Sequence, residues 1–365
     1  MIKNQVEIAI VGGGLIGMLT AYALVKSGAD VAVIEKSASA LESSWAGGGI
    51  LSPLYPWRYP DAVNELAFKS QHMYASLVDD IQRESGIDPQ YRQCGMSILA
   101  DDMDEAAYHW LRDHKITYTD SAPDWNRVES RRYVYLPQIA QIRNPRFIKS
   151  LMVALEKRGV EFSFNNTVSA FEKSENGEFL LSTAKGQWQA KRIIICAGAW
   201  TAKLLGNIVP TIASEVAPEM EINPVRGQML LYLAPETLIS SIILSKGKYI
   251  IPRKDGRVLV GSTMENAGFN KATTGEAKFE LKAFVEDICP VLSQYPIEQH
   301  WSGLRPGSPD GTPFIGEHPQ ISGLYINSGH FRNGVVMAPA SAQLMCDLIQ
   351  GNRTSVDPEA YALAR

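Results

Sequence analysis

The chain has 365 residues, a length that favours two domains over one continuous core. Apolar residues make up 45% of it and charged residues 20%, which is ordinary for a globular protein. The net charge is −4 and there is no basic stripe, which argues against nucleic acid as a partner. No uninterrupted stretch of about 18 apolar residues occurs, so the sequence predicts no membrane span.

The cysteines and histidines suggest neither a disulfide nor a metal site. Cys94, Cys196, Cys289 and Cys346 lie far apart and follow no CxxC spacing. We therefore expect reduced, mostly buried thiols in a cytoplasmic protein. The six histidines do not cluster with the cysteines, so no metal is expected.

Residues 6–36 have the order of elements that binds a dinucleotide. Val6–Val11 predicts a buried strand, and Leu15–Lys26 predicts a helix that ends before Gly28. Val31–Ile34 predicts a second buried strand, with Glu35 at its end. A strand, a helix and a second strand in this order are the context that a nucleotide-binding glycine motif requires.

Gly12, Gly14 and Gly17 lie between the first strand and the helix, with G-x-G-x-x-G spacing. The first glycine allows a tight turn, the second lets the backbone approach a pyrophosphate, and the third lets helix and strand pack closely. The start of the helix favours anionic phosphates. Glu35 is suited to accept hydrogen bonds from ribose hydroxyls and would repel a 2′-phosphate, which disfavours NADP.

The segment SSWAGGGILSP, residues 43–53, favours FAD over NAD. It is small and glycine-rich, so it is able to lie flat against a large planar ring and to offer it backbone N–H groups. Ser43 and Ser44 are candidates to bind phosphate or ribitol oxygens. A plain flexible loop is the alternative interpretation.

The middle of the chain predicts an amphipathic helix over 61–85, followed by short strands and a polar helix over 90–143. Asn144 predicts a helix N-cap and Pro145 its first residue, with the helix ending at about Arg158. The strands expected next are Val160–Phe164, 168–174, 179–183 and a buried strand within 192–201. The last ends on Ala197 and Gly198, small residues that allow a nucleotide to approach.

From about residue 216 the pattern changes to strands without crossover helices, which suggests an antiparallel sheet. The expected strands are Arg226–Leu233, Lys248–Pro252, Arg257–Ser262 and Glu298–Gly303, with a helix over Glu276–Asp287. One more strand and a turn follow Gly323, and a buried helix containing Pro339 is expected over 335–350.

These elements predict an α/β fold with two domains. The first is a Rossmann-like FAD-binding domain made of residues 1–85, 145–215 and 304–365. The second is an α+β substrate-binding domain built on the antiparallel sheet, made of residues 86–144 and 216–303.

One charged residue stands out in WSGLRPGSPDGTPFIG, residues 301–316. Arg305 lies among glycines, prolines and a leucine, and a guanidinium in poorly solvated surroundings needs a partner. A carboxylate ligand would provide that partner through two parallel hydrogen bonds. The alternative is a surface arginine with a backbone partner.

Several motifs together resemble the D-amino acid oxidase (DAO) superfamily of flavoproteins, and within it the glycine oxidases. They are GGGLIG with Glu35, SSWAGGGILSP, ICAGAW, NPVRGQML, YIIPRKDGRVLVGSTME, WSGLRPGSPDGTPFIG and SGHFRNGVVMAPA. Their order and spacing fit over nearly the whole chain. The fold implied is a DAO-type FAD domain with a second substrate domain.

The resemblance, together with the glycine motif and the ICAGAW strand end, assigns a set of residues to FAD. They are Gly12, Gly14, Leu15, Ile16, Gly17, Glu35, Lys36, Ser43, Ser44, Gly47, Gly48, Gly49, Ile50, Val168, Ala197, Gly198, His330, Phe331, Arg332, Asn333, Gly334, Val335 and Val336.

The resemblance also implies the substrate site. Arg305 would clamp the substrate carboxylate, Tyr249 would hydrogen-bond it, Arg332 would lie near the amine, and Met264 would line the pocket. Each has a simpler interpretation as well: Tyr249 as sheet packing, Met264 as core filling and Arg332 as a loop-orienting residue. Trp45, Gly247 and Lys248 depart from the expected pattern and leave the substrate size open.

The activity implied is oxidative deamination of glycine or of small D- or N-methyl amino acids. A hydride would pass from Cα to flavin N5, the imino acid would hydrolyse to an oxo acid and ammonia, and oxygen would yield hydrogen peroxide. A link to thiamine thiazole synthesis and a homotetramer are also implied. The alternatives are a D-amino acid or sarcosine-type dehydrogenase that uses a quinone, a non-catalytic FAD-binding subunit and, more distantly, an NAD-dependent dehydrogenase.

Overall fold

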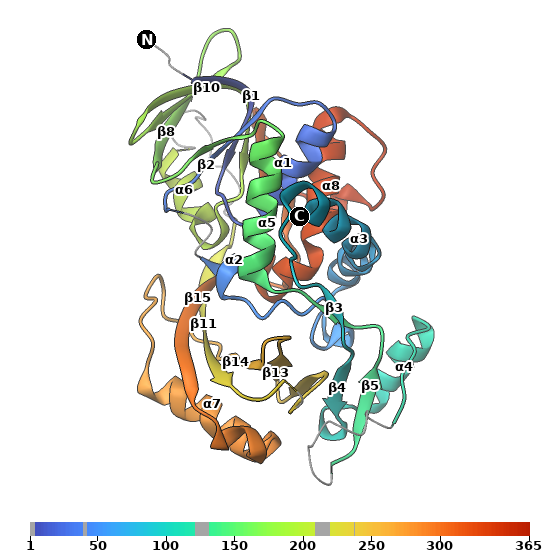
Figure 1. The fold of residues 1–365 in the computed structure, drawn as a ribbon. Helices are drawn as coiled ribbons and strands as arrows, with labels where there is room; N and C mark the ends of the chain where they lie inside the picture. Colours follow the sequence, from blue (N-terminus) through green and yellow to red (C-terminus); the bar gives the residue numbers. More distant parts are fainter. Residues whose placement is uncertain (1–3, 39–41, 121–130, 209–219, 237) are drawn as a thin grey trace.

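The computed structural model describes residues 4–38, 42–120, 131–208, 220–236 and 238–365. Figure 1 shows two large sheets at opposite ends of the molecule, with the short helix α2 (Ser43–Ala46) between them. A small pair, β3 (Arg92–Gln93) with β6 (Ala140–Gln141), lies apart from both sheets.

The first sheet is the nucleotide-binding type that the sequence predicts. Its strand order is β16-β17-β10-β1-β2-β7, and the run from β17 to β7 is parallel. The long strand β10 pairs first with β9 and then, over Ile193–Ile195, with β17. The strands are β1 (Asn4–Val11), β2 (Val31–Ile34), β7 (Glu161–Ser163), β8 (Val168–Lys173), β9 (Phe179–Thr183), β10 (Gly186–Ile195), β16 (Phe314–His318) and β17 (Ile321–Ser328).

Both faces of this sheet are covered, which explains the unbroken apolar runs of its strands. Ile8 and Ile10 point toward a layer of four helices, and Ala9 and Val11 point toward the β8–β9 hairpin and α6 (Thr201–Ile208). The four helices lie together in Figure 1. They are α1 (Leu15–Lys26), α3 (Asp61–Ser85), α5 (Asn144–Lys157) and α8 (Gly334–Gln350).

The second sheet has the order β15-β11-β14-β13-β12-β4-β5. Its strands are β4 (Met96–Leu99), β5 (Tyr133–Leu136), β11 (Asn223–Leu233), β12 (Ile242–Ser245), β13 (Lys248–Pro252), β14 (Arg257–Gly261) and β15 (Ile297–Gly307). Helix α7 (Gly275–Ile288) packs on one face of this sheet, and α4 (Glu105–Asp113) contributes to the apolar cluster on the opposite face.

The expectation of a purely antiparallel sheet is wrong at one place, because β12 and β4 are parallel. These two strands come from segments separated by more than a hundred residues, so no local turn sets their direction. The strand β12 itself was not expected. Its four residues are all buried and apolar runs of that length do not distinguish a strand from other buried segments.

Two local predictions also need correction. The helix that was to follow Asn144 as N-cap instead includes it, and Arg143 occupies the N-cap position. The Asn144 side chain is used elsewhere, since its Nδ2 donates to the Ser44 carbonyl at 2.7 Å. The expected loop over 43–53 begins with the helical turn α2.

The domain boundaries stay a prediction. The boundary at 215/216 lies outside the described residues. Strand β15 runs through the boundary at 303/304, so Arg305 lies on the second sheet. All four cysteines are buried and free, as expected. Among the residues that the structure describes, none of the helices combines the length and the apolar character needed to cross a membrane.

Candidate cofactor and substrate site

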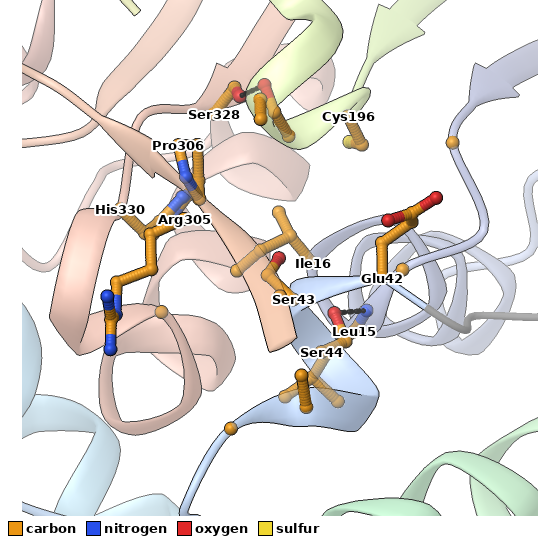
Figure 2. Close-up of a pocket in the computed structure, with 18 of the residues that line it drawn as sticks. Leu15, Ile16, Glu42, Ser43, Ser44, Cys196, Arg305, Pro306, Ser328 and His330 are labelled. Carbon is orange, nitrogen blue, oxygen red and sulfur yellow. Dashed lines mark hydrogen bonds between the residues drawn. The ribbon is translucent and has the colours of Figure 1, made fainter. Parts of the chain in front are cut away.

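A cavity of about 350 Å³ opens between the carboxyl ends of the parallel strands and the second sheet. Ligands bind at this edge of open α/β sheets. In the view of Figure 2, Glu42 and Cys196 lie on one side of the cavity and Arg305 on the other. One end thus belongs to the nucleotide-binding sheet and the other to β11, β13 and β15.

Most of the predicted site residues line this cavity, although they come from segments far apart in the chain. They are Gly12, Gly14, Leu15, Ile16, Glu35, Lys36, Ser43, Ser44, Gly47, Gly48, Gly49, Ile50, Val168, Ala197, Gly198, Tyr249, Arg305, His330, Phe331, Arg332, Gly334 and Val335. Their individual roles toward a ligand remain predictions.

Gly17, Asn333, Val336 and Met264 are not among the lining residues. Gly17 is a packing residue, since a Cβ there would lie 2.0 Å from the Gly12 carbonyl oxygen. Val336 is 1% exposed within the helical core, and Asn333 occupies the N-cap position of α8 without a capping hydrogen bond from its side chain. Met264 is 53% exposed, which contradicts its interpretation as core filling.

The glycine turn has the geometry that the motif predicts. Gly12 has φ +116°, and a Cβ there would lie 2.3 Å from the Cys196 carbonyl oxygen, so no larger residue fits. No side chain caps α1 at Gly14, and the Leu15 N–H donates to Ser44 Oγ at 2.9 Å (Figure 2). A helix start carries unpaired N–H donors and positive potential, which suits the pyrophosphate of FAD.

Glu35 holds the turn in place from the end of β2. Its Oε2 accepts the Gly13 N–H at 2.8 Å, and its Oε1 accepts the Ser37 N–H at 2.9 Å and the Ser37 hydroxyl at 2.6 Å. A carboxylate has about four acceptor sites, so about one remains for a ribose hydroxyl. This second, structural role of Glu35 was not visible in the sequence.

The residues after β10 include contributors that the sequence analysis missed. Trp200 and Lys203 line the cavity, as do Asn166 and Ser328. Lys36 Nζ lies 2.9 Å from the centroid of the Trp200 ring and 3.6 Å from Glu42 Oε1, and burial lowers its pKa. The motif ICAGAW carried the signal for Trp200, but only its alanine and glycine were selected.

Arg305 reaches the cavity because of a glycine on the neighbouring strand. In the antiparallel pair β11–β15, Val225 faces Arg305 and Gly227 faces Gly303. The guanidinium lies across Gly227, where a Cβ would be 2.2 Å from its Nη2. The long arginine side chain therefore folds over a strand position that has no side chain of its own.

The partners of Arg305 are all neutral oxygens. Its Nη2 donates to Ser262 Oγ at 2.6 Å, and its Nη1 donates to the Thr263 and Arg226 carbonyls at 3.2 and 3.4 Å. Burial lowers the pKa of Arg305, and the positive Arg332 acts in the same direction. Within the described part of the chain, no carboxylate forms an ion pair with it.

Arg226, on the opposite face of β11, shows what a neutralised arginine looks like in the same sheet. Its Nη2 lies 2.6 Å from Glu265 Oε2, and Gln228 and Thr263 also donate to that carboxylate. The carboxylate nearest in sequence to the Arg305 partners is therefore committed to the other arginine. This arrangement leaves Arg305 suited to bind an anionic ligand.

Tyr249 is buried beside Arg305, on the cavity face of β13. Its hydroxyl donates to the sulfur of Met229 at 3.5 Å. A thioether is a weak acceptor, so a ligand oxygen would be a better partner for this hydroxyl.

Arg332 lines the cavity and contacts two segments that connect strands of the second sheet. Its Nη2 donates to the Gly247 carbonyl at 2.8 Å, and its Nη1 contacts Met264 Sδ at 3.3 Å. The three residues that left the substrate size open, Trp45, Gly247 and Lys248, are not among the lining residues. Trp45 packs edge-on against Trp301 at 5.7 Å, and Lys248 pairs with Glu280 at 2.9 Å.

His330 lines the cavity as a neutral imidazole. It is 1% exposed, its Nε2 lies 3.0 Å from Ser341 Oγ, and burial lowers its pKa to about 3. The imidazole ring is therefore uncharged at neutral pH and carries a single N–H proton.

Comparison with known proteins identifies the family. The DAO family profile, described as FAD dependent oxidoreductase, matches residues 7–348. A glycine oxidase of Pseudomonas aeruginosa is 38% identical over 366 residues, which cover 98% of each chain. A bifunctional ThiO/ThiG protein of Nostoc sp. is 28% identical, over 94% of this chain and 52% of that protein.

Among solved structures, a glycine oxidase from Geobacillus kaustophilus superposes with a TM-score of 0.92 at 26% identity. That alignment covers 100% of this chain and 99% of the other. The glycine turn, the uncapped helix start and Glu35 fit the FAD that the profile implies. The chain therefore belongs to the DAO family of FAD-dependent oxidoreductases, and FAD is its cofactor.

Proposed function

We propose that the chain oxidises the amine of glycine or of another small amino acid, of the sarcosine, D-alanine or D-proline class. The observation that carries this proposal is Arg305, a cation at the cavity whose partners are neutral oxygens. A guanidinium binds a carboxylate through two parallel hydrogen bonds, which fixes both position and orientation. The relatives named glycine oxidase support the choice of a small amino acid.

In this proposal the protein positions the substrate. Arg305 holds the carboxylate and the Tyr249 hydroxyl donates a further hydrogen bond to it, so the Cα–H bond has one orientation. FAD, when bound, would supply the acceptor for a hydride from Cα. Orientation alone can lower the activation barrier of such a reaction substantially, by on the order of 7–11 kcal/mol at best.

Arg305 and Arg332 together favour the neutral, reactive form of the substrate amine. Arg332 lies near Arg305, and nearby positive charge disfavours an ammonium group. A neutral amine carries the lone pair that assists hydride loss, so no strong side-chain base is needed. The imino acid then reacts with water to give an oxo acid and ammonia, and oxygen takes the electrons as hydrogen peroxide.

The setting of this reaction is also part of the proposal. The ThiO/ThiG relative supports a role in supplying thiamine thiazole synthesis. We further propose a cytoplasmic homotetramer, which size-exclusion chromatography with light scattering will test.

The experiment is an anaerobic absorption spectrum of the purified holoprotein before and after addition of glycine. We expect the oxidised flavin bands to bleach, and to return with hydrogen peroxide when air is admitted. Bands that stay oxidised with glycine, sarcosine, D-alanine and D-proline alike would contradict the proposal. Bleaching without recovery in air, reversed instead by a quinone, would favour the dehydrogenase.

A further inference from the structure

The cavity face of β13 packs closely against Gly48, in the glycine segment that forms part of the cavity wall. Tyr249 and Ile251 alternate along the strand and so point to the same side, and Arg253 follows directly after its last residue. A Cβ on Gly48 would lie 2.8 Å from Ile251 Cδ1 and 3.0 Å from Tyr249 Cε2. Arg253 completes the contact, because its Nη2 donates to the Gly48 carbonyl at 2.8 Å. Gly48 lines the cavity, so this guanidinium lies one peptide group behind the wall.

Arg253 is a buried cation with neutral partners. It is 8% exposed, and its Nη1 donates to Gln141 Oε1 at 2.5 Å and to the Ile142 carbonyl at 3.2 Å. Burial lowers its pKa to about 10, so it stays charged at neutral pH. A buried charge without a counter-ion is costly, and the protein retains it at the cavity wall.

The nearest acidic group is committed to other residues. Asp255 Oδ2 lies 2.7 Å from Arg143 Nη1 and 3.1 Å from Arg257 Nη1. Arg143 is thus paired, and its guanidinium donates to Gln90 and Asp255, whereas Arg253 donates to Gly48 in the cavity wall. The two arginines lie in one neighbourhood but differ in charge compensation and in contact with the wall.

We propose that Arg253 is a positioning residue that fixes the Gly48 carbonyl and keeps an uncompensated positive charge behind the cavity wall, where it raises the reduction potential of the bound FAD. Reduction adds electrons to the cofactor, and a positive charge in a poorly solvated interior stabilises the more negative form. The inference concerns the cofactor and holds whichever amino acid is the electron donor.

The test uses the holoprotein and the variants Arg253→Met, Arg253→Lys and Arg143→Met. The midpoint potential is measured anaerobically against a reference dye with xanthine and xanthine oxidase as the reductant, so no amino acid is involved. We expect a lower potential and weaker FAD binding in R253M. R253K, which retains the charge, should keep the wild-type potential, and R143M should keep both properties.

A wild-type potential in R253M, or an equal drop in R143M, would overturn the proposal. If R253M does not retain FAD, Arg253→Gln replaces it, because its amide still offers a donor to the Gly48 carbonyl without the charge. A lower potential in R253Q than in R253K is then expected. Equal potentials in these two variants, or loss of FAD in both, would reduce Arg253 to a purely structural residue.

Discussion

The two ends of the cavity differ in the groups that shape them. At the cofactor end, the glycine turn around Gly12 and Gly14 brings backbone groups to the wall, and Glu35, itself a lining residue, holds that turn in place. At the substrate end, the long side chains of Arg305, Tyr249 and Arg332 form it. The first end depends on how closely strands approach one another, and the second depends on where individual charges find partners.

This difference predicts different responses to mutation. A change at the glycine turn disturbs the backbone, so folding and FAD binding fail together. A change at the substrate end removes one interaction, so FAD stays bound while turnover falls. The following predictions test this contrast, from the largest expected effect to the smallest.

Gly12→Ala should abolish FAD binding and destabilise the fold. The new Cβ meets the Cys196 carbonyl oxygen at 2.3 Å, and the backbone there has φ +116°. Gly28→Ala is the matched control, since Gly28 has φ +91° with nothing within 4 Å of a Cβ. The control should lose only about 1–2 kcal/mol of stability, the cost of the backbone conformation. Similar FAD content in the two purified variants would contradict the close-approach argument.

Arg305→Met should leave FAD bound and lower kcat/KM for glycine by roughly two orders of magnitude. The estimate follows from about 3 kcal/mol for a charge-assisted contact whose partner is left without a counter-ion. Arg257→Met, at a strand arginine whose guanidinium pairs with Glu298 at 2.7 Å, is the control and should remain active. Steady-state oxygen consumption measures both. An R305M protein with normal turnover would remove the carboxylate clamp from the proposal.

His330→Gln should change how stability depends on pH. His330 is neutral in the folded protein with a pKa of about 3, while an unfolded histidine binds a proton below about pH 6.5. Its burial therefore costs stability as the pH falls from 6.5 toward 3, about 2 kcal/mol by pH 5. Urea unfolding at pH 7.5 and pH 5 should show this loss in the wild type and a smaller loss in the variant.

The control for that experiment is His72→Gln, at an exposed histidine of α3. It should lose as much stability as the wild type between the two pH values. If H330Q loses as much stability as the wild type, groups other than His330 dominate the loss of stability at acidic pH.

Phe269→Ala tests a contact at the cofactor end between the segment that follows β14 and the turn that follows β10. The Phe269 ring packs 5.5 Å from the ring of Trp200, a cavity residue, and lies under Lys203 Nζ at 5.6 Å. Loss of about 1 kcal/mol should weaken FAD binding roughly fivefold. Phe279→Ala, at a ring that is 75% exposed on α7, should leave the Kd unchanged. Equal Kd values for both variants in a fluorescence titration would exclude this contact from cofactor retention.

The sequence alone determined the elements whose signals are local. The glycine spacing, the flanking apolar strands and Glu35 lie within about thirty residues, so the nucleotide-binding turn was predictable in detail. The bounds of α1, α3 and β13 were also correct, because an apolar periodicity and clear end signals coincide there. Arg305 was identifiable because its neighbours in the chain offer it no counter-ion.

Only the tertiary structure decided which partners the charges have. Nothing local assigns Glu265 to Arg226 rather than to Arg305; the register of β11 against β15 places them on opposite faces. The contact between Arg253 and Gly48 joins residues 205 positions apart, and the parallel pairing of β12 with β4 joins separate segments. Such contacts depend on the packing of the whole chain, and no periodicity in a short stretch encodes them.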